Sequence, residues 1–237
     1  MRAHATSPGY TGSRSILASL LLLAAIGCDG KGGTPATESS DPAAYAVMLP
    51  RDARDSALVA AARAARAAVD SQVHASPGSM ILVAGLANGS MALVSPPGGW
   101  PESTAVSYDV FPDQRGQVRL AFQTPFSQSG DWNLDLSHYF DAREATFLVE
   151  RQMSFFNGCW DDSTGKMVPI RETTTTYLDS TGRIVARDFV RSTFDDDPVP
   201  TRRCNTTMRP PYSVYPSWDS LASATGLARV LARPAHS

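Results

Sequence analysis

The stretch MVPIRETTTTYLDSTGRIVARDFVRSTF, residues 167–194, decides the fold of this chain. Four consecutive threonines near its middle are β-branched, and such side chains suit a pleated strand better than a helix. The Asp-Ser-Thr-Gly segment that follows Leu178 is typical of a tight turn. We therefore predict an antiparallel hairpin of strands 167–178 and 183–194, in which Leu178 faces Arg183 and paired residue numbers add to 361.

Similar strand signals extend upstream of this hairpin. Asn88-Gly89 is a strong signal for a hairpin turn, and it lies between apolar segments at 80–87 and 90–95. Turn-forming residues separate four further strand-like segments, at 104–111, 116–124, 132–140 and 145–156. Residues 139–143 and 177–181 each carry a tyrosine followed two positions later by an aspartate, which indicates the same turn chemistry at two hairpins. Together these segments predict an antiparallel β-meander.

A helix is expected before the strands, beginning near Asp52, whose side chain can cap the first turn. Its apolar positions recur every three or four residues and form one stripe: Leu58, Ala62, Ala65, Val69 and Val73. Because the stripe is rich in alanine, we expect the helix to lie close against the sheet; the alternative is a helix on a membrane surface. Residues 217–233 are a candidate for a short C-terminal helix. The predicted fold class is α+β, an antiparallel β-meander sheet with an N-terminal amphipathic helix.

The first 27 residues have the composition of a secretory signal. Residues 1–14 contain two arginines and no acidic group, and residues 16–26 are apolar apart from Ser19. An eleven-residue helix reaches only about 16 Å, which is too short for a hydrocarbon core of about 30 Å. We therefore expect residues 1–27 to be a signal peptide that is removed.

The sequence Ala25-Ile26-Gly27-Cys28, at the end of this apolar stretch, resembles the lipobox of bacterial prolipoproteins. The resemblance implies that a dedicated peptidase cuts before Cys28 and that this cysteine carries a diacylglyceryl group. Two acyl chains anchor a protein stably, where one chain does not. The alternatives are a plain cleaved signal and an uncleaved anchor. The resemblance also implies a bacterial cell envelope location, lipid-anchored on the extracytoplasmic side, with the choice of inner or outer membrane open.

Residues 28–42 are expected to form a lipid-anchored flexible tether, because they contain no large apolar residue. Residues 43–237 are expected to form a single globular domain. After removal of residues 1–27 the chain has 19 basic and 23 acidic residues, a net charge of −4. This balance argues against nucleic acid as a partner. The expected partners are the membrane, through lipidated Cys28, and an envelope protein or small ligand.

Two further cysteines, Cys159 and Cys204, remain in a compartment that oxidises thiols, so we predict a disulfide between them. Their residue numbers add to 363, which places both just beyond the open end of the 167–194 hairpin and nearly opposite each other. A bulge would absorb the difference of two positions. Two free buried thiols are the alternative.

Motifs for metal binding are weak in this sequence. Asp131-Trp132-Asn133-Leu134-Asp135 opens like a calcium-binding loop, but Leu136 and Ala142 stand where that loop needs a glycine and a glutamate. Alternating polar residues also describe one face of a strand. Asp195-Asp196-Asp197 is interpreted as a solvated turn. We expect no metal and no cofactor.

Motifs for catalysis are equally weak. His74 and His138 have no visible catalytic partner, and we interpret them as surface or strand histidines. Glu150 and Glu172 lie on strand-like segments, where we expect them to face solvent. We name no catalytic residue. The sequence favours a membrane-anchored, non-catalytic module that binds a ligand or partner in the cell envelope. The alternative is a small envelope hydrolase with an unrecognised carboxylate or Ser/His site.

Overall fold

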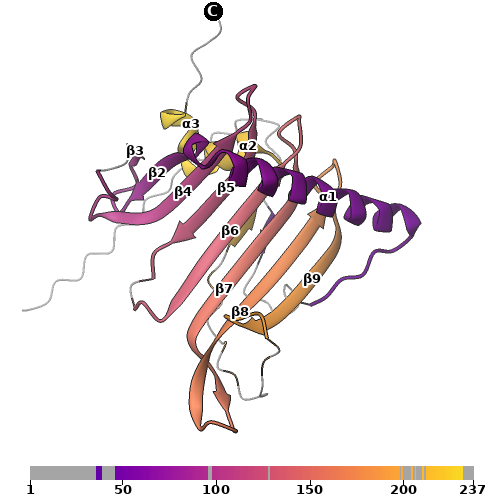
Figure 1. Cartoon of the computed structure of the whole chain (residues 1–237). Coiled ribbons are helices and arrows are strands. Elements are labelled where there is room, and N and C mark those ends of the chain that lie inside the picture. The colour runs from indigo at the N-terminus through magenta and orange to yellow at the C-terminus, as the bar shows by residue number, and fades with distance from the viewer. Residues whose placement is uncertain are drawn as a thin grey trace, which may run out of the picture. The chain divides into compact units, whose positions relative to one another are not determined.

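A computed structural model describes residues 36–38 and 46–231, apart from positions 96–97, 128, 198, 200–203, 205, 207–209 and 211 (Figure 1). The expected signal peptide, Cys28 and most of the expected tether lie outside the described residues. None of the helices among the described residues is long and apolar enough to cross a membrane.

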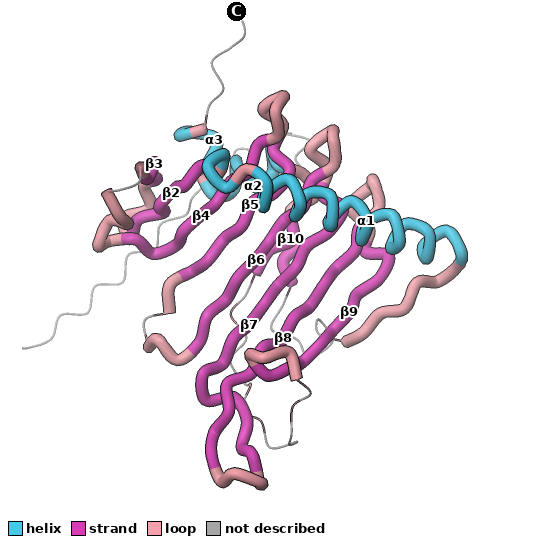
Figure 2. Tube along the Cα trace, in the orientation of Figure 1, coloured by secondary structure: helices cyan, strands magenta, loops and turns pink. Residues whose placement is uncertain are grey.

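An eight-stranded antiparallel sheet dominates the described part of the chain (Figure 2). Its strands are β2 (Ile81–Leu86), β3 (Met91–Val94), β4 (Thr104–Pro112), β5 (Val118–Pro125), β6 (Trp132–Phe140), β7 (Thr146–Asp161), β8 (Lys166–Leu178) and β9 (Ile184–Thr193). They follow the order β3-β2-β4-β5-β6-β7-β8-β9, so only β3 departs from the order of the sequence. Two short strands, β1 (Ala36–Glu38) and β10 (Tyr212–Val214), form a separate antiparallel pair. The expected antiparallel sheet with a few helices is confirmed.

The two faces of the large sheet carry different helices (Figure 1). Helix α1 (Ala53–Ala75) packs on the face that carries Leu148, Tyr177 and Ala186, which we call the α1 face. Helices α2 (Trp218–Thr225) and α3 (Leu227–Val230) pack on the opposite face, the α2 face. Because neighbouring residues of a strand point to opposite faces, each strand contributes to both layers of core.

Helix α1 begins as its sequence indicates. The Asp52 carboxylate accepts a hydrogen bond from the Asp55 backbone N–H at 2.8 Å and so caps the first turn. Val59, Ala62 and Val69 are buried against the sheet. Small side chains at this contact allow the helix axis to lie close to the strands.

Three hairpin loops at one end of the sheet, which we call the Asp turns, share one pattern of hydrogen bonds. Asp113, Asp141 and Asp179 each use Oδ1 to accept from the backbone N–H groups two and four positions later. In each loop the third residue after the aspartate has a positive φ, and that residue is glycine in two of the three. In the third loop it is Glu144, whose carboxylate also accepts from the Val118 N–H at 2.8 Å. The turn chemistry expected for residues 139–143 and 177–181 is therefore the same.

The register of the β8–β9 hairpin differs from the prediction. Leu178 pairs with Ile184 and not with Arg183, and Tyr177 pairs with Ala186, so most paired numbers add to 363. Asp179 bonds to Arg183 across a three-residue loop in which Gly182 has φ +81°, which adds one position to the sum, and the irregularity between Tyr177 and Leu178 adds a second. The predicted sum of 361 was wrong for this reason.

The predicted disulfide between Cys159 and Cys204 is confirmed. Its place in the sheet differs from the expectation, because β7 runs on to Asp161 and includes Cys159. Cys159 pairs with Val168 of β8 on one side and with Cys204 on the other. The disulfide therefore joins the segment after β9 to strand β7, and the cysteines do not extend the β8–β9 hairpin.

Candidate functional site

A polar hollow of about 560 Å³ lies between helix α1 and strands β7, β8 and β9 on the α1 face. We call it the helix–sheet groove. Its lining is mainly charged or hydrogen-bonding: Arg63, Arg66, Asp70, Glu150, Gln152, Arg171, Thr173, Thr175, Tyr177, Asp188, Ser192 and Asp196. The strands supply alternate residues to this face, so a row of polar side chains on each strand meets the helix.

Arg66 holds the middle of the helix–sheet groove. Its guanidinium donates two hydrogen bonds to the Glu150 carboxylate, at 2.6 and 3.1 Å, and lies 3.4 Å from Asp70. The Tyr139 hydroxyl donates to Asp70 at 2.9 Å. Burial raises the pKa of Tyr139, so the phenol stays protonated and remains a donor. These contacts hold four side chains from a helix and two strands in one arrangement.

Arg63 forms a second linked set one turn earlier on the helix. It donates to Asp188 at 2.8 Å and to the Tyr177 hydroxyl at 3.0 Å, and that hydroxyl donates to Asp188 at 2.8 Å. Burial raises the pKa of Tyr177, which keeps this phenol neutral as well. Nearer the start of β8, on the same face, Arg171 pairs with Asp196 at 3.0 Å. The charged side chains of the groove are thus paired with one another.

The neighbouring part of the α1 face is a hydrogen-bonded patch around Asp135. Its carboxylate accepts from Thr124 and from Asn133, each at 2.9 Å. Asn133 and Asp135 therefore lie on one face of β6, as alternation in a strand requires. Among the described residues, no group of three or more His, Cys, Asp or Glu side chains could hold a metal ion. In the Asp195-Asp196-Asp197 segment, the Asp196 carboxylate accepts a hydrogen bond from Arg171.

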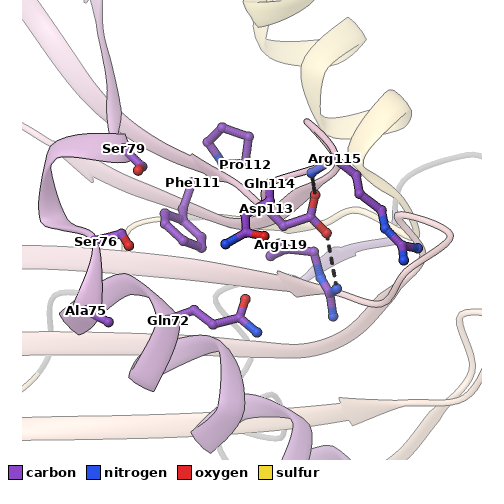
Figure 3. A pocket seen from close by; sticks show the side chains of 10 residues that line it. All are labelled: Gln72, Ala75, Ser76, Ser79, Phe111, Pro112, Asp113, Gln114, Arg115 and Arg119. Atoms are coloured by element: carbon purple, nitrogen blue, oxygen red, sulfur yellow. Dashed lines mark hydrogen bonds and ion pairs between the residues drawn. The ribbon is translucent and has the colours of Figure 1, made fainter.

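A second hollow, of about 580 Å³, opens at the end of the β4–β5 hairpin (Figure 3). We call it the β4–β5 cleft. Its lining comes from the last turn of α1, the short helical segment Pro77–Ser79 and the hairpin: Gln72, Ala75, Ser76, Ser79, Phe111, Pro112, Asp113, Gln114, Arg115 and Arg119. Figure 3 shows the two serines on one side of the cleft and the two arginines on the other.

The histidines lie in different surroundings. His138 is fully buried on the α2 face, and its Nε2 accepts from the Tyr215 backbone N–H at 3.4 Å. His138 is a strand histidine of β6, and the partner that covers it is a backbone amide. Burial lowers the pKa of His138 to about 3, so the ring is neutral. His74 is exposed in the last turn of α1.

The two glutamates do not converge. Glu150 pairs with Thr175 across β7 and β8 and lies on the α1 face. Glu172 lies on the α2 face, fully buried, and accepts two hydrogen bonds from Arg191 at 2.9 and 2.5 Å. The expectation that it faces solvent was wrong, because the segment after β9 covers that face of β8. A carboxylate pair for hydrolysis is not formed by these two residues.

The groove and the cleft were not found by sequence reasoning. Strand alternation could have indicated that Glu150 and Tyr177 share a face, but the partner helix residues lie 84 and 114 positions away. Comparison with protein-family models, curated proteins and solved structures found no match to this chain.

Proposed function

We propose that this protein is an exported lipoprotein, anchored to a membrane through lipid on Cys28, whose body binds a ligand or partner in the cell envelope without catalysis. Residues 1–27 would be the signal peptide, and residues 43–237 a single α+β domain. The protein would lie on the extracytoplasmic side of the inner or the outer membrane.

The observation that carries the proposal for the body is the pairing of charges in the helix–sheet groove. Arg66 pairs with Glu150 and with Asp70, which accepts from the Tyr139 hydroxyl, and Arg63 pairs with Asp188, which accepts from the Tyr177 hydroxyl. Such side chains are set in place before a ligand arrives, which reduces the entropy lost on binding. A general acid or base must instead exchange a proton with its substrate. Fixed, mutually neutralised pairs suit recognition of a polar ligand.

The lipid anchor is tested by intact-mass analysis of the protein extracted from bacterial membranes. The expected mass is that of residues 28–237 plus a diacylglyceryl group. The Cys28→Ser variant should lose the acyl mass and leave the membrane fraction. A soluble protein that begins at another residue, and that is unchanged in Cys28→Ser, would reject the anchor.

Binding by the groove is tested with soluble glycopeptide fragments of the bacterial cell wall as the probe. These fragments carry the hydroxyl, amide and charged groups that the groove can contact. We expect saturable binding by calorimetry, weakened about tenfold or more in Arg66→Gln/Glu150→Gln, which removes the paired charges together. Arg229→Gln, an exposed change on helix α3, is the matched control and should bind as the wild type does.

The same mixture of protein and glycopeptide fragments tests the alternative that the protein is a hydrolase. Mass spectrometry of the fragments should show no change in their masses after incubation with the protein. Cleaved products that depend on the protein would replace the binding module with an envelope hydrolase. Absence of binding by the wild type would remove cell-wall fragments as the ligand.

A further inference from the structure

The β4–β5 cleft carries more positive than negative charge. Its lining contains one carboxylate, Asp113, and two guanidiniums, Arg115 and Arg119; the other polar groups are amides and hydroxyls. The Asp113 carboxylate is already committed, because Oδ1 accepts from the backbone N–H groups of Arg115 and Gln117 at 2.9 and 3.0 Å. Its Oδ2 lies 3.6 Å from Arg119.

The guanidiniums of Arg115 and Arg119 have N–H groups that make no hydrogen bond with the described residues. Arg119 donates Nε–H to the Phe140 carbonyl at 3.1 Å and its Nη1 faces Asp113, which leaves part of its five-donor set unused. This side chain is only 20% exposed, so its charge is partly shielded from water. The guanidinium of Arg115 makes no hydrogen bond or ion pair with any residue that the structure describes. Both lie at the same side of the cleft (Figure 3).

The rest of the lining suits a ligand that has an apolar part and a polar edge. Phe111, which is 4% exposed, Pro112 and Ala75 also line the cleft, so part of its wall is apolar. Gln72 and Gln114 offer amides, and Ser76 and Ser79 offer hydroxyls. A hollow with apolar walls and a few convergent polar groups is the usual form of a small-molecule site.

We propose that the β4–β5 cleft binds a small organic carboxylate, with the anionic group at Arg119 and Arg115 and the apolar part against Phe111. The planar fork of a guanidinium matches the two oxygens of a carboxylate. A cleft of about 580 Å³ has room for a ligand the size of an aromatic acid. This inference rests on the proposed binding role of the body, and it adds a second site on the same side of the sheet.

The probe for this site is phenylacetate, with its neutral amide phenylacetamide and inorganic phosphate as comparisons. Binding to the mature chain purified from membranes in non-ionic detergent is followed through the ring protons of the probe by NMR, against protein-free micelles. We expect saturable binding of phenylacetate, at least tenfold weaker binding of phenylacetamide, and no displacement by an equal concentration of phosphate.

Variants locate the site. Arg119→Gln should weaken phenylacetate binding about tenfold, and Arg115→Gln should weaken it severalfold, because that side chain is exposed. Arg143→Gln is the matched control, since Arg143 occupies the position in the Asp141 turn that Arg115 occupies in the Asp113 turn. It should bind as the wild type does. Arg115→Gln removes no described side-chain contact, so it remains informative if Arg119→Gln does not fold.

Three outcomes would overturn the inference. Phenylacetamide that binds as tightly as phenylacetate would show that no anion is recognised. An equal loss in Arg143→Gln would show that the effect is a general one of net charge. Displacement by phosphate would show that any small oxyanion is accepted and that the carboxylate class is wrong. None of these results bears on the acyl mass at Cys28 or on the groove probe, so failure here is distinct from failure of the proposed function.

Discussion

The two ends of the eight-stranded sheet are held together in different ways. At one end, the three Asp turns close their hairpins with hydrogen bonds between residues at most four positions apart. At the other end, β7 and β8 continue through a bulge after Phe155 and are joined by a disulfide to Cys204. The hairpins of the first end are closed by local contacts, to which Glu144 adds a bond to Val118, whereas the second end depends on a covalent contact between distant parts of the chain.

Exposure of apolar groups follows the same division. Phe156 and Trp160, on the far part of β7, are 45% and 37% exposed, and Met167 opposite Trp160 is 41% exposed. The Asp turns present carboxylates, hydroxyls and backbone groups instead. The comparison shows that a turn closed by its own side chain needs little support from the core, whereas an extended hairpin needs a covalent or packed partner.

The largest effect is expected from removal of the disulfide. The double variant Cys159→Ser/Cys204→Ser should lower the free energy of unfolding by about 4 kcal/mol in the chain-entropy description of a loop of this size. The cysteines are 45 positions apart in the sequence. Urea denaturation of the variant and of the reduced wild type measures the loss, and both should agree. A loss below about 1 kcal/mol would mean that the far end of β7 and β8 is held by packing alone.

The bulge in β7 is expected to tolerate no side chain at Gly158. A Cβ atom added there would lie 2.3 Å from Cγ1 of Ile170, so the core must shift to accept it. Gly158→Ala should lower the free energy of unfolding by about 2 kcal/mol. Gly78→Ala is the control, because nothing lies within 4 Å of its added Cβ. Equal stability of the two variants in urea would contradict the close packing at the bulge.

His138, near the Asp turn of β6 and β7, is expected to make the fold sensitive to acid. Burial lowers its pKa to about 3 in the folded protein, whereas the unfolded chain binds a proton near the ordinary value of 6.5. The unfolded state is therefore favoured as pH falls below 6.5, and the sensitivity ends near pH 3. The loss is about 1.4 kcal/mol per pH unit, hence about 2 kcal/mol between pH 7 and pH 5.

Urea denaturation at several pH values checks this dependence. His138→Gln should flatten the part of the profile between pH 6.5 and pH 5, while His74→Ala, a change at an exposed helix residue, should leave it as in the wild type. A profile that is identical in His138→Gln and wild type would assign the acid sensitivity to other groups.

The smallest effect is expected at a single Asp turn. Burial alone would raise the pKa of Asp179, but hydrogen bonds from Thr181 and Arg183 outweigh it and bring the pKa to about 2. This carboxylate therefore stabilises the fold above its ordinary pKa, and the contribution is lost as pH falls through about 2. Asp179→Ala should lower the free energy of unfolding at pH 7 by about 1 kcal/mol. Asp179→Asn, which keeps an acceptor oxygen, should recover part of that loss.

Local signals in the sequence predicted most strands and the cap of α1. The Asn88-Gly89 hairpin forms, although its loop contains three residues, because Leu86 pairs with Ser90 through a backbone hydrogen bond and Gly89 has φ +80°. A three-residue loop ending at Gly182 likewise moved the pairs of β8 and β9 by one position, and the irregularity between Tyr177 and Leu178 moved most of them by one more. Turn type therefore limits register prediction, since one residue of loop length moves every pair that follows.

What the sequence determined by itself is the set of local choices: the strands, the Asp turns, the Asp52 cap and a pair of cysteines suited to a disulfide. Each depends on residues within a few positions, or on a count of thiols. The tertiary structure alone decided that Arg66 meets Glu150, that Glu172 is buried with Arg191, and that the β4–β5 cleft gathers Arg119 beside Phe111. The contact of Arg66 with Glu150 joins residues 84 positions apart, that of Glu172 with Arg191 joins residues 19 positions apart, and the cleft brings the end of α1 against the β4–β5 hairpin. Which of them form depends on strand register and on how whole layers pack, because no local rule fixes which helix covers which strands.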